Sequence, residues 1–328
     1  MLGRRIIPTA KTERREAVLY NSAPERETMK PPPFKYLAPD SLEQALELMA
    51  QYGEEAKLLA GGQSLIPAMN FRVAQPAVLV DLNRIAALSY IQSDGEGSLA
   101  VGAMTRQRDL EFAPQVAERA PLLYECMPHI AHPQIRNRGT LGGSLAHADP
   151  AAELPVVALA ASSRIRAKSS QAERWIEADQ FFRGMFTTAL QPGEILVEVV
   201  FPPAEPRTGW SFLEAARRRG DYAMMGVAAS LSLDAQGTCG EARLVFMNAG
   251  DGPIDARQAA AGLGGQRPGP EAFEEAAAAA QREIDPLGNV HASVAYQRHL
   301  ATVLTRRALA IAFERARGEG SAPVPDAS

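Results

Sequence analysis

Cysteine is nearly absent from this chain. Among 328 residues there are only Cys126 and Cys239, and no C-x-x-C pair occurs. A disulfide framework, a structural zinc site and a cysteine-ligated iron–sulfur cluster each need more thiolates than two isolated cysteines supply. Because so low a count suits a reducing compartment, we expect a cytoplasmic protein.

An excess of either charge is also missing. The 34 Lys and Arg residues nearly balance the 38 Asp and Glu residues, which leaves a formal net charge of −4. Such a chain has no basic field to attract nucleic acid or an acidic membrane surface. The run Arg217–Arg219 has no interleaved aromatic residues, so we interpret it as a solvated segment or an interface.

Long apolar runs are absent as well. No window reaches the roughly 18 consecutive apolar residues of a membrane-spanning helix, and the richest stretch, residues 151–161, contains Glu153 and Pro155. The pair Arg4-Arg5 suggests a twin-arginine export signal, but charged residues 11–16 stand where its apolar region should follow. We therefore expect neither export nor membrane contact.

The chain nevertheless has ample material for folded domains, because 46% of its residues are hydrophobic. We expect a disordered extension at each end and two folded domains between them, the first with two subdomains. The expected bounds are 1–28 and 319–328 for the extensions, 29–204 for the first domain with subdomains at about 29–85 and 86–204, and 205–318 for the second.

Hydrophobic periodicity predicts an α+β protein. In the first domain, Asp40-Ser41 is an N-cap signal for a helix that ends near Gly53. Strands are expected at 57–60, 77–82, 98–103, 164–168 and 194–201, helices at 106–113, 115–127 and 153–161, and a polar loop at 132–138. In the second, a three-stranded antiparallel meander (212–216, 223–233, 242–247) precedes helices at about 271–283 and 293–317.

Two glycine pairs, Gly61-Gly62 and Gly142-Gly143, follow extended segments and precede a serine. Without Cβ atoms, backbone can approach a ligand closely and successive N–H groups can form a concave nest for phosphate oxygens. Each pair alone is more often an ordinary turn. Neither fits G-x-G-x-x-G or the Walker sequence. The sequence therefore predicts two candidate phosphate nests and leaves open whether both bind.

The titratable residues give weaker indications of function than the glycine pairs. His129, His132 and His147 show no metal-ligand spacing. Asp149 and Glu153 are four residues apart, which would suit acid–base work on one helix face. Alternatively, Asp149 caps a helix that has Pro150 at its first position.

Three segments together resemble the FAD-binding medium subunit of molybdenum hydroxylases, the group of the carbon monoxide and xanthine dehydrogenase flavoproteins. They are AGGQSL at 60–65, HPQIRNRGTLGGS at 132–144 and AHADPAAELP at 146–155. RRGDYA at 218–223 resembles the start of that family's C-terminal domain. The resemblance extends from about residue 29 to about 317, and it implies a fold similar to the vanillyl-alcohol-oxidase (PCMH) type with two FAD-binding subdomains.

The resemblance also implies the site residues. The FAD pyrophosphate would lie between two motifs, namely Leu59, Ala60, Gly61, Gly62, Gln63, Ser64 and Leu65, and Thr140, Leu141, Gly142, Gly143 and Ser144. Five further positions correspond to family positions near the flavin or in its motifs: Ile130, Asp149, Glu153, Phe186 and Leu196. The resemblance implies no catalytic side chain and no metal ligand in this chain.

The implied function is electron relay within a complex. A large subunit with a molybdenum cofactor would oxidise the substrate, and two [2Fe-2S] clusters in a small subunit would pass electrons to the FAD of this chain. The scarcity of cysteine agrees with clusters in a partner. We expect a heterotrimer or a dimer of heterotrimers. Two alternatives are a stand-alone flavin oxidase or reductase of the same superfamily and a non-redox module that binds a phosphorylated metabolite.

Overall fold

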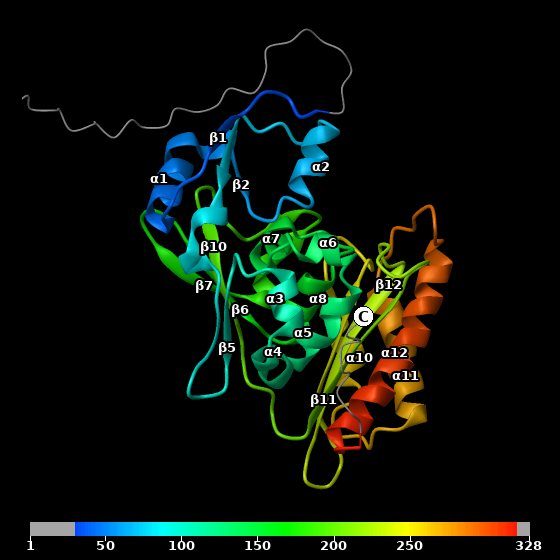
Figure 1. Ribbon diagram of the computed structural model, residues 1–328. Helices are drawn as coiled ribbons and strands as arrows, with labels where there is room; N and C mark the ends of the chain where they lie inside the picture. Colours follow the sequence, from blue (N-terminus) through cyan, green and yellow to red (C-terminus); the bar gives the residue numbers. More distant parts are fainter. Residues whose placement is uncertain (1–29, 320–328) are drawn as a thin grey trace, which may run out of the picture.

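The computed structural model describes residues 30–319 (Figure 1). The expected extension at residues 1–28 and almost all of the expected tail lie outside this range. Within residues 30–319, every helix is too short or too polar to span a bilayer.

The first part of the chain forms a small parallel sheet with two helices. Its elements are β1 (Lys35–Leu37), α1 (Leu42–Tyr52), β2 (Ala56–Leu59), α2 (Leu65–Asn70) and β3 (Val78–Asp81), with strand order β1-β3-β2. The predicted cap is confirmed, because the Ser41 hydroxyl accepts from the Gln44 N–H at 3.2 Å. Gly53, at φ +50°, ends α1. Since β3 lies between β1 and β2, both of its edges are hydrogen-bonded, and all four of its residues are buried.

The second part is built on a five-stranded antiparallel sheet of order β4-β5-β10-β6-β7. The strands are β4 (Ile91–Ser93), β5 (Leu99–Gly102), β6 (Arg164–Lys168), β7 (Glu173–Glu177) and β10 (Ile195–Phe201). The helices are α3 (Gln107–Phe112), α4 (Pro114–Arg119), α5 (Pro121–Cys126), α6 (Pro133–Arg136), α7 (Leu141–His147), α8 (Glu153–Ala160) and α9 (Ala178–Phe181), and a small hairpin pairs β8 (Phe182–Gly184) with β9 (Thr187–Thr188).

Three local predictions for this part are wrong. The helix expected at 115–127 is divided, because Pro121 has no N–H to continue α4 and instead opens α5. The loop expected at 132–138 contains the short helix α6, which also begins at a proline, Pro133. Asp149 does not cap α8: its carboxylate accepts from the Ala151 N–H at 2.9 Å within a turn, and α8 starts only at Glu153.

The last part is a four-stranded antiparallel sheet of order β11-β12-β13-β14 covered by helices. Its elements are β11 (Thr208–Ala215), β12 (Met225–Leu233), β13 (Cys239–Met247), β14 (Ile254–Asp255), α10 (Arg257–Ala261), α11 (Pro270–Glu283) and α12 (Val294–Ala316). The prediction of three strands missed β14, which has only two residues. The two long helices are confirmed.

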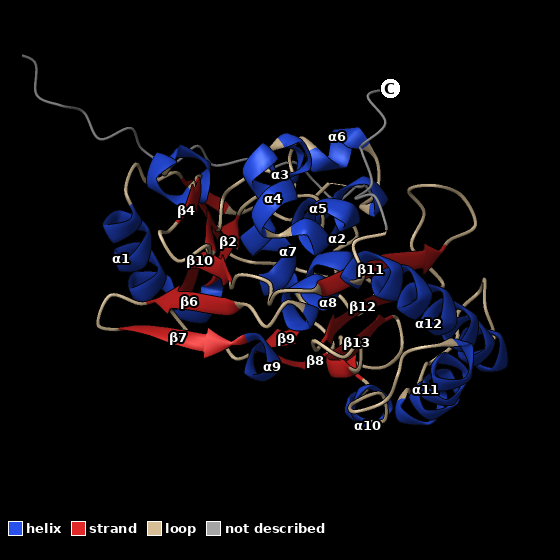
Figure 2. Ribbon diagram, turned by 90° about the horizontal axis from the view of Figure 1, so that it is seen from below, coloured by secondary structure: helices blue, strands red, loops and turns tan. Residues whose placement is uncertain are grey.

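The sheet of the last part is buried on both faces (Figure 2). Val227, Ala229 and Leu231 of β12 belong to the core shared with α11 and α12, whereas Ala228 belongs to the core shared with α5 and α8. Helix α8 packs between β12 and β13 on one side and helices α5 and α7 on the other, and every residue from Leu154 to Ala160 is buried. The second and third parts therefore share one apolar core, which fixes them against each other.

Candidate functional site

The two glycine pairs, distant in sequence, meet in space. An ideal Cβ on Gly61 would lie 2.4 Å from the Arg138 carbonyl oxygen and 2.8 Å from the Gly139 Cα. A Cβ on Gly143 would lie 3.2 Å from the Ala60 Cβ. The absence of these side chains therefore lets two backbone segments pack directly on each other.

The first glycine pair forms an open turn between β2 and α2. Gly62 has φ +73°, a left-handed conformation that L-residues rarely adopt. Within residues 30–319, the backbone N–H groups of residues 61–64 have no hydrogen-bond acceptor. The Gln63 side-chain amide donates to the Gly61 carbonyl at 3.1 Å, which closes the turn. Gly61, Gly62 and Gln63 are half-buried and Ser64 is exposed. Successive N–H groups without acceptors in one turn are what an anion-binding nest requires.

The second pair differs from the predicted loop. Gly142 and Gly143 lie in the first turn of α7, and Thr140 is the N-cap whose hydroxyl accepts from the Gly143 N–H at 3.1 Å. The N–H groups of Leu141, Gly142 and Ser144 donate to the carbonyls of Thr105, Ala103 and Thr140, respectively. The second pair is therefore not an open nest in this structure, because all four amides already have acceptors, and the contact of residues 140–144 with FAD stays a prediction.

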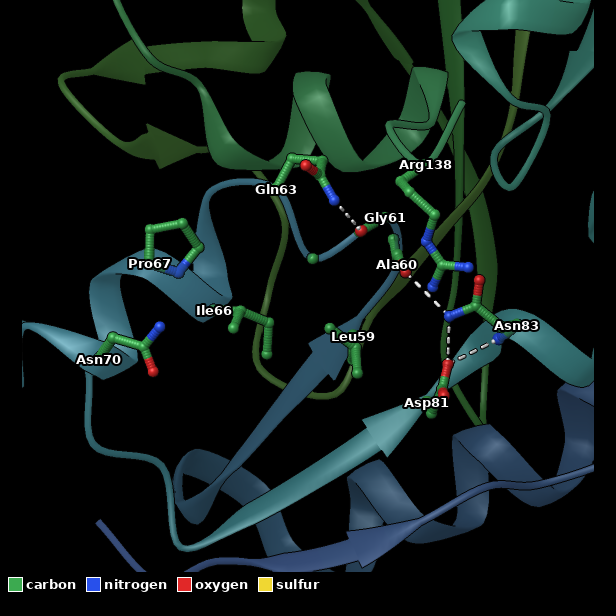
Figure 3. Close-up of a pocket in the computed structure, with 11 residues that line it drawn as sticks. Leu59, Ala60, Gly61, Gln63, Ile66, Pro67, Asn70, Asp81, Asn83 and Arg138 are labelled. Carbon is green, nitrogen blue, oxygen red and sulfur yellow. Dashed lines mark hydrogen bonds between the residues drawn. The ribbon is translucent and has the colours of Figure 1, made fainter. Parts of the chain in front are cut away.

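A hollow of about 370 Å³ opens beside the first turn (Figure 3). It is lined by residues of β2, the turn, α2, the end of β3 and the segment before α7: Leu59, Ala60, Gly61, Gly62, Gln63, Ile66, Pro67, Asn70, Asp81, Asn83 and Arg138. Five of these eleven, Leu59 to Gln63, belong to the predicted site. The second motif, residues 140–144, borders the turn without lining the hollow.

A polar network supports the base of the turn. Asn83 donates from Nδ2 to the Ala60 carbonyl at 2.9 Å and to Asp81 Oδ1, and its Oδ1 accepts from Arg106. A second nitrogen of the Arg106 guanidinium donates to the Arg138 carbonyl. Sequence reasoning missed these residues. The available signal was Asp81, an acidic residue at the end of an otherwise apolar strand beside β2.

The charged residues that line the hollow are Asp81 and Arg138. Arg138 is exposed and has no acidic partner within residues 30–319. Burial, followed by the neighbouring charge of Arg138, lowers the pKa of Arg106. The Arg106 guanidinium donates to Asn83 and to the Arg138 carbonyl, whereas the Arg138 guanidinium lines the hollow. Arg138 beside unpaired N–H donors fits a phosphate-bearing ligand, because such an anion offers acceptors to both kinds of donor.

The other end of α7 carries a second group of predicted residues. The ring of Phe186 lies 5.0 Å from that of His147, and the Phe186 N–H donates to the Ala148 carbonyl at 3.0 Å. Phe186 is 54% exposed, whereas Ile130 and Leu196 are only 6% and 4% exposed within the apolar core. Helix α7 thus connects the glycine turn to Phe186, while Ile130 and Leu196 face packed side chains.

Acidic residues gather behind the same region. Burial and the nearby carboxylate of Glu214 raise the pKa of Glu153 to about 8. Glu214 accepts one contact, from His129 Nδ1 at 3.4 Å, and its Oε2 is buried without a partner. Glu153 therefore holds a proton at neutral pH. No group of three potential metal ligands occurs within residues 30–319.

Comparison with known proteins identifies this arrangement. A family model described as the FAD binding domain in molybdopterin dehydrogenase matches residues 32–204, and one described as the CO dehydrogenase flavoprotein C-terminal domain matches residues 210–312. The 6-hydroxypseudooxynicotine dehydrogenase complex subunit alpha of Paenarthrobacter nicotinovorans is 43% identical over 289 residues, which cover 88% of this chain and 97% of that protein. The carbon monoxide dehydrogenase medium chain of Hydrogenophaga pseudoflava is 36% identical over 287 residues, or 88% and 99% of the two chains.

The structural comparison agrees. A solved structure of the Hydrogenophaga pseudoflava carbon monoxide dehydrogenase that lacks the Mo-pyranopterin moiety superposes with a TM-score of 0.84 and 38% identity, and the match covers 87% of this chain and 99% of that one. These matches define a class, the flavin-binding subunits of oxidoreductases. The chain belongs to the family of FAD-binding medium subunits of molybdenum hydroxylases.

Three predictions are thereby confirmed: the family, the α+β fold with an FAD-binding and a C-terminal domain, and FAD as cofactor. The relatives are subunits of dehydrogenase complexes, which supports a subunit function over a stand-alone flavin oxidase or a non-redox module. The hollow fits FAD by its donor set, since free amides and Arg138 suit a pyrophosphate.

Proposed function

We propose that this chain binds FAD with its pyrophosphate at the turn of residues 61–64 and links electron donors in a partner subunit to an external acceptor. The single observation that carries the proposal is the turn whose four N–H groups have no acceptor, beside Arg138 and a hollow of about 370 Å³. When bound, FAD would accept electrons singly and deliver them in pairs. The protein supplies binding, orientation and electrostatics.

Each part of the predicted site has a role in this proposal. The amides of residues 61–64 bind the phosphate oxygens, and Arg138 offsets their charge. Residues 140–144 support the turn from behind, and Leu59, Ala60 and Leu65 hold its two ends. Helix α7, about 10 Å long by its rise per residue, directs the flavin toward Phe186 and Asp149, with Ile130 and Leu196 in the packing below.

Glu153 has a separate task. Because its pKa is raised to about 8, its carboxyl keeps a proton at neutral pH beside Glu214. We propose that it thereby keeps one negative charge out of the flavin region. The proposed boundary between the domains lies near residue 204, and its support is that the two family matches end at 204 and begin at 210.

The partners follow from the family. We propose a large molybdenum-cofactor subunit and a small subunit with two [2Fe-2S] clusters, assembled as a heterotrimer or a dimer of heterotrimers. The matched relatives are named as subunits or medium chains. Both cysteines of this chain are buried and free, which agrees with a reducing cytoplasm.

The test is purification of the chain with and without its partners. We expect the chain alone to bind one FAD and to show the flavin absorption bands. A cluster-bearing small subunit should be needed for reduction by substrate. A colourless chain that takes up no added FAD would contradict the proposal, and so would substrate oxidation by the isolated chain.

A further inference from the structure

The side-chain amide of Asn83 is fully used. Its Nδ2 donates both hydrogens, one to the Ala60 carbonyl at 2.9 Å and one to Asp81 Oδ1, and its Oδ1 accepts from Arg106. An asparagine amide has two donor hydrogens and one acceptor oxygen. Rotation by half a turn would set its oxygen against two other oxygens, so the orientation of the amide is fixed.

The two side chains that bind Asn83, Asp81 and Arg106, are themselves held in place. The Asp81 side chain is buried, and its Oδ1 also accepts from the Asn83 backbone N–H at 2.9 Å. Asp81 Oδ2 accepts from the Tyr36 hydroxyl, and burial together with this hydrogen bond raises the pKa of Tyr36 to about 12, so Tyr36 stays a donor. Arg106 donates to the Arg138 carbonyl as well. The network therefore runs from β1 to the segment before α7.

The planarity of the peptide bond fixes the direction of the N–H group that follows the Ala60 carbonyl. In a trans peptide the C=O of one residue and the N–H of the next are coplanar and point in opposite directions. Asn83 holds the Ala60 carbonyl on its own side of the turn. The Gly61 N–H, the first of the four free amides, must therefore point away from Asn83.

We propose that Asn83 is a positioning residue for the FAD pyrophosphate, because by holding the Ala60 carbonyl it directs the Gly61 N–H toward the phosphate oxygens. The inference rests on the proposed function. Asn83 acts through the backbone of the turn, and Arg106 acts through Asn83. This role of Arg106 depends on the geometry of its two hydrogen bonds, so a positive charge without those bonds does not fulfil it.

The experiment measures the dissociation constant of FAD for the full chain stripped of flavin, with ADP as a competing probe that carries the same pyrophosphate. We expect Asn83→Ala to weaken FAD and ADP by the same factor, about tenfold, the size of one lost hydrogen bond at a binding loop. Arg106→Lys keeps the charge but cannot reach two acceptors with one ammonium group, and we expect it to weaken both by about threefold.

The matched control is Gln297→Ala. The Gln297 amide also holds two backbone carbonyls, those of Met224 at 3.0 Å and Asn248 at 3.2 Å, and accepts from the Gly288 N–H at 2.9 Å. It lies in the C-terminal domain, so its loss should lower the melting temperature without changing the FAD dissociation constant.

Several results would overturn the inference. FAD affinity could be unchanged in Asn83→Ala, or FAD could weaken while ADP does not. If Asn83→Ala does not fold, an unchanged FAD affinity in Arg106→Lys decides against it. Failure of the proposed function is distinct, because then the wild-type chain itself would bind no FAD.

Discussion

The two glycine pairs look alike in sequence but have different structural roles. Gly61 and Gly62 lie in a turn whose N–H groups are free, whereas Gly142 and Gly143 lie in the first turn of α7 with their N–H groups paired. The first pair exposes donors to a ligand. The second allows a helix to approach Ala103 and Ala60 closely.

The position of each pair relative to its helix explains the difference. Thr140 has the extended conformation of an N-cap, and its hydroxyl accepts from the third N–H of α7. Ser64 precedes α2 with φ −107° and ψ −44°, and its side chain makes no capping hydrogen bond. A capped helix start satisfies its own donors. A cap at Ser64 would serve Ile66 or residue 67, but the Ile66 N–H already donates to the Gly62 carbonyl and Pro67 has no N–H. The free donors of residues 61–64 lie before α2, outside its hydrogen-bonded turns.

The largest effect is expected for Gly61→Ala. Its Cβ would lie 2.4 Å from a backbone oxygen, so the two glycine segments must separate. Overpacking of this kind costs about 1–3 kcal/mol of folding free energy, and the displaced turn should lose FAD. We expect almost no flavin to copurify, as measured by the ratio of flavin to protein absorbance.

Gly95→Ala is the matched control for Gly61→Ala. A Cβ at Gly95 meets nothing within 4 Å, so this variant should keep its flavin. Full flavin occupancy in Gly61→Ala would show that the contact between the two pairs does not hold the site.

A smaller loss is expected for Gly62→Ala. At φ +73° an alanine is strained by about 1–2 kcal/mol, and its Cβ would lie 3.2 Å from Ile66 and Leu59 side-chain atoms, which can adjust. Relaxation of the turn should weaken FAD by about tenfold, the equivalent of 1.4 kcal/mol, in a fluorescence titration.

Gly237→Ala is the control that separates backbone strain from FAD binding in the Gly62→Ala variant. Gly237 has φ +79°, a Cβ there meets nothing within 4 Å, and the residue lies in the turn between β12 and β13. The same strain should lower stability at Gly237 and leave FAD affinity unchanged. Equal FAD affinities for both variants would remove Gly62 from the proposed site.

The sequence was sufficient for elements that carry their own signals. The cap at Ser41, the apolar α8 and the alternation in β10 and β12 are properties of contiguous residues, and all were predicted within a few positions. Strand β7 was missed because it lies at a sheet edge and buries only Ile176. An edge strand with one buried residue has no apolar pattern to detect.

The candidate site likewise contains residues that the sequence predicted and residues that it did not. Glycine pairs are visible in sequence, so the first turn was found. Asn83, Arg106 and Arg138 were not, because their importance comes from hydrogen bonds between segments far apart in the chain. The contact of Gly142 and Gly143 with the cofactor stays a prediction, and glycine spacing alone did not reveal that the Thr140 cap and backbone carbonyls pair the amides of residues 141–144.

Hydrogen exchange tests directly whether the amides of the two glycine pairs respond differently to FAD. Removal of FAD should speed exchange of the amides of residues 61–64, which have no acceptor of their own. The amides of residues 141–144 should stay protected in both forms, because the protein supplies their acceptors. The measurement is mass spectrometry of peptides that cover each motif, with and without flavin. Equal protection changes in both motifs would contradict the division of tasks.

The smallest effect on FAD affinity is expected for substitution of Thr140, the N-cap of α7. Thr140→Val keeps the shape of the buried side chain but leaves the Gly143 N–H without its acceptor, which should cost about 1 kcal/mol of stability. Thr140→Ser restores the hydroxyl and should restore the melting temperature. Ser293→Ala, which removes the N-cap of α12, is the control for a cap far from the hollow.

FAD affinity in Thr140→Val decides between two tasks for the second pair. If residues 140–144 only support the turn, affinity should change by less than about threefold, which is under 1 kcal/mol, while stability falls as in Ser293→Ala. If the freed Gly143 N–H instead turned to the phosphate, affinity would rise as stability fell. That opposite movement would mean that Thr140 competes with the ligand for one donor, and the second pair would then be a nest held closed by its own cap.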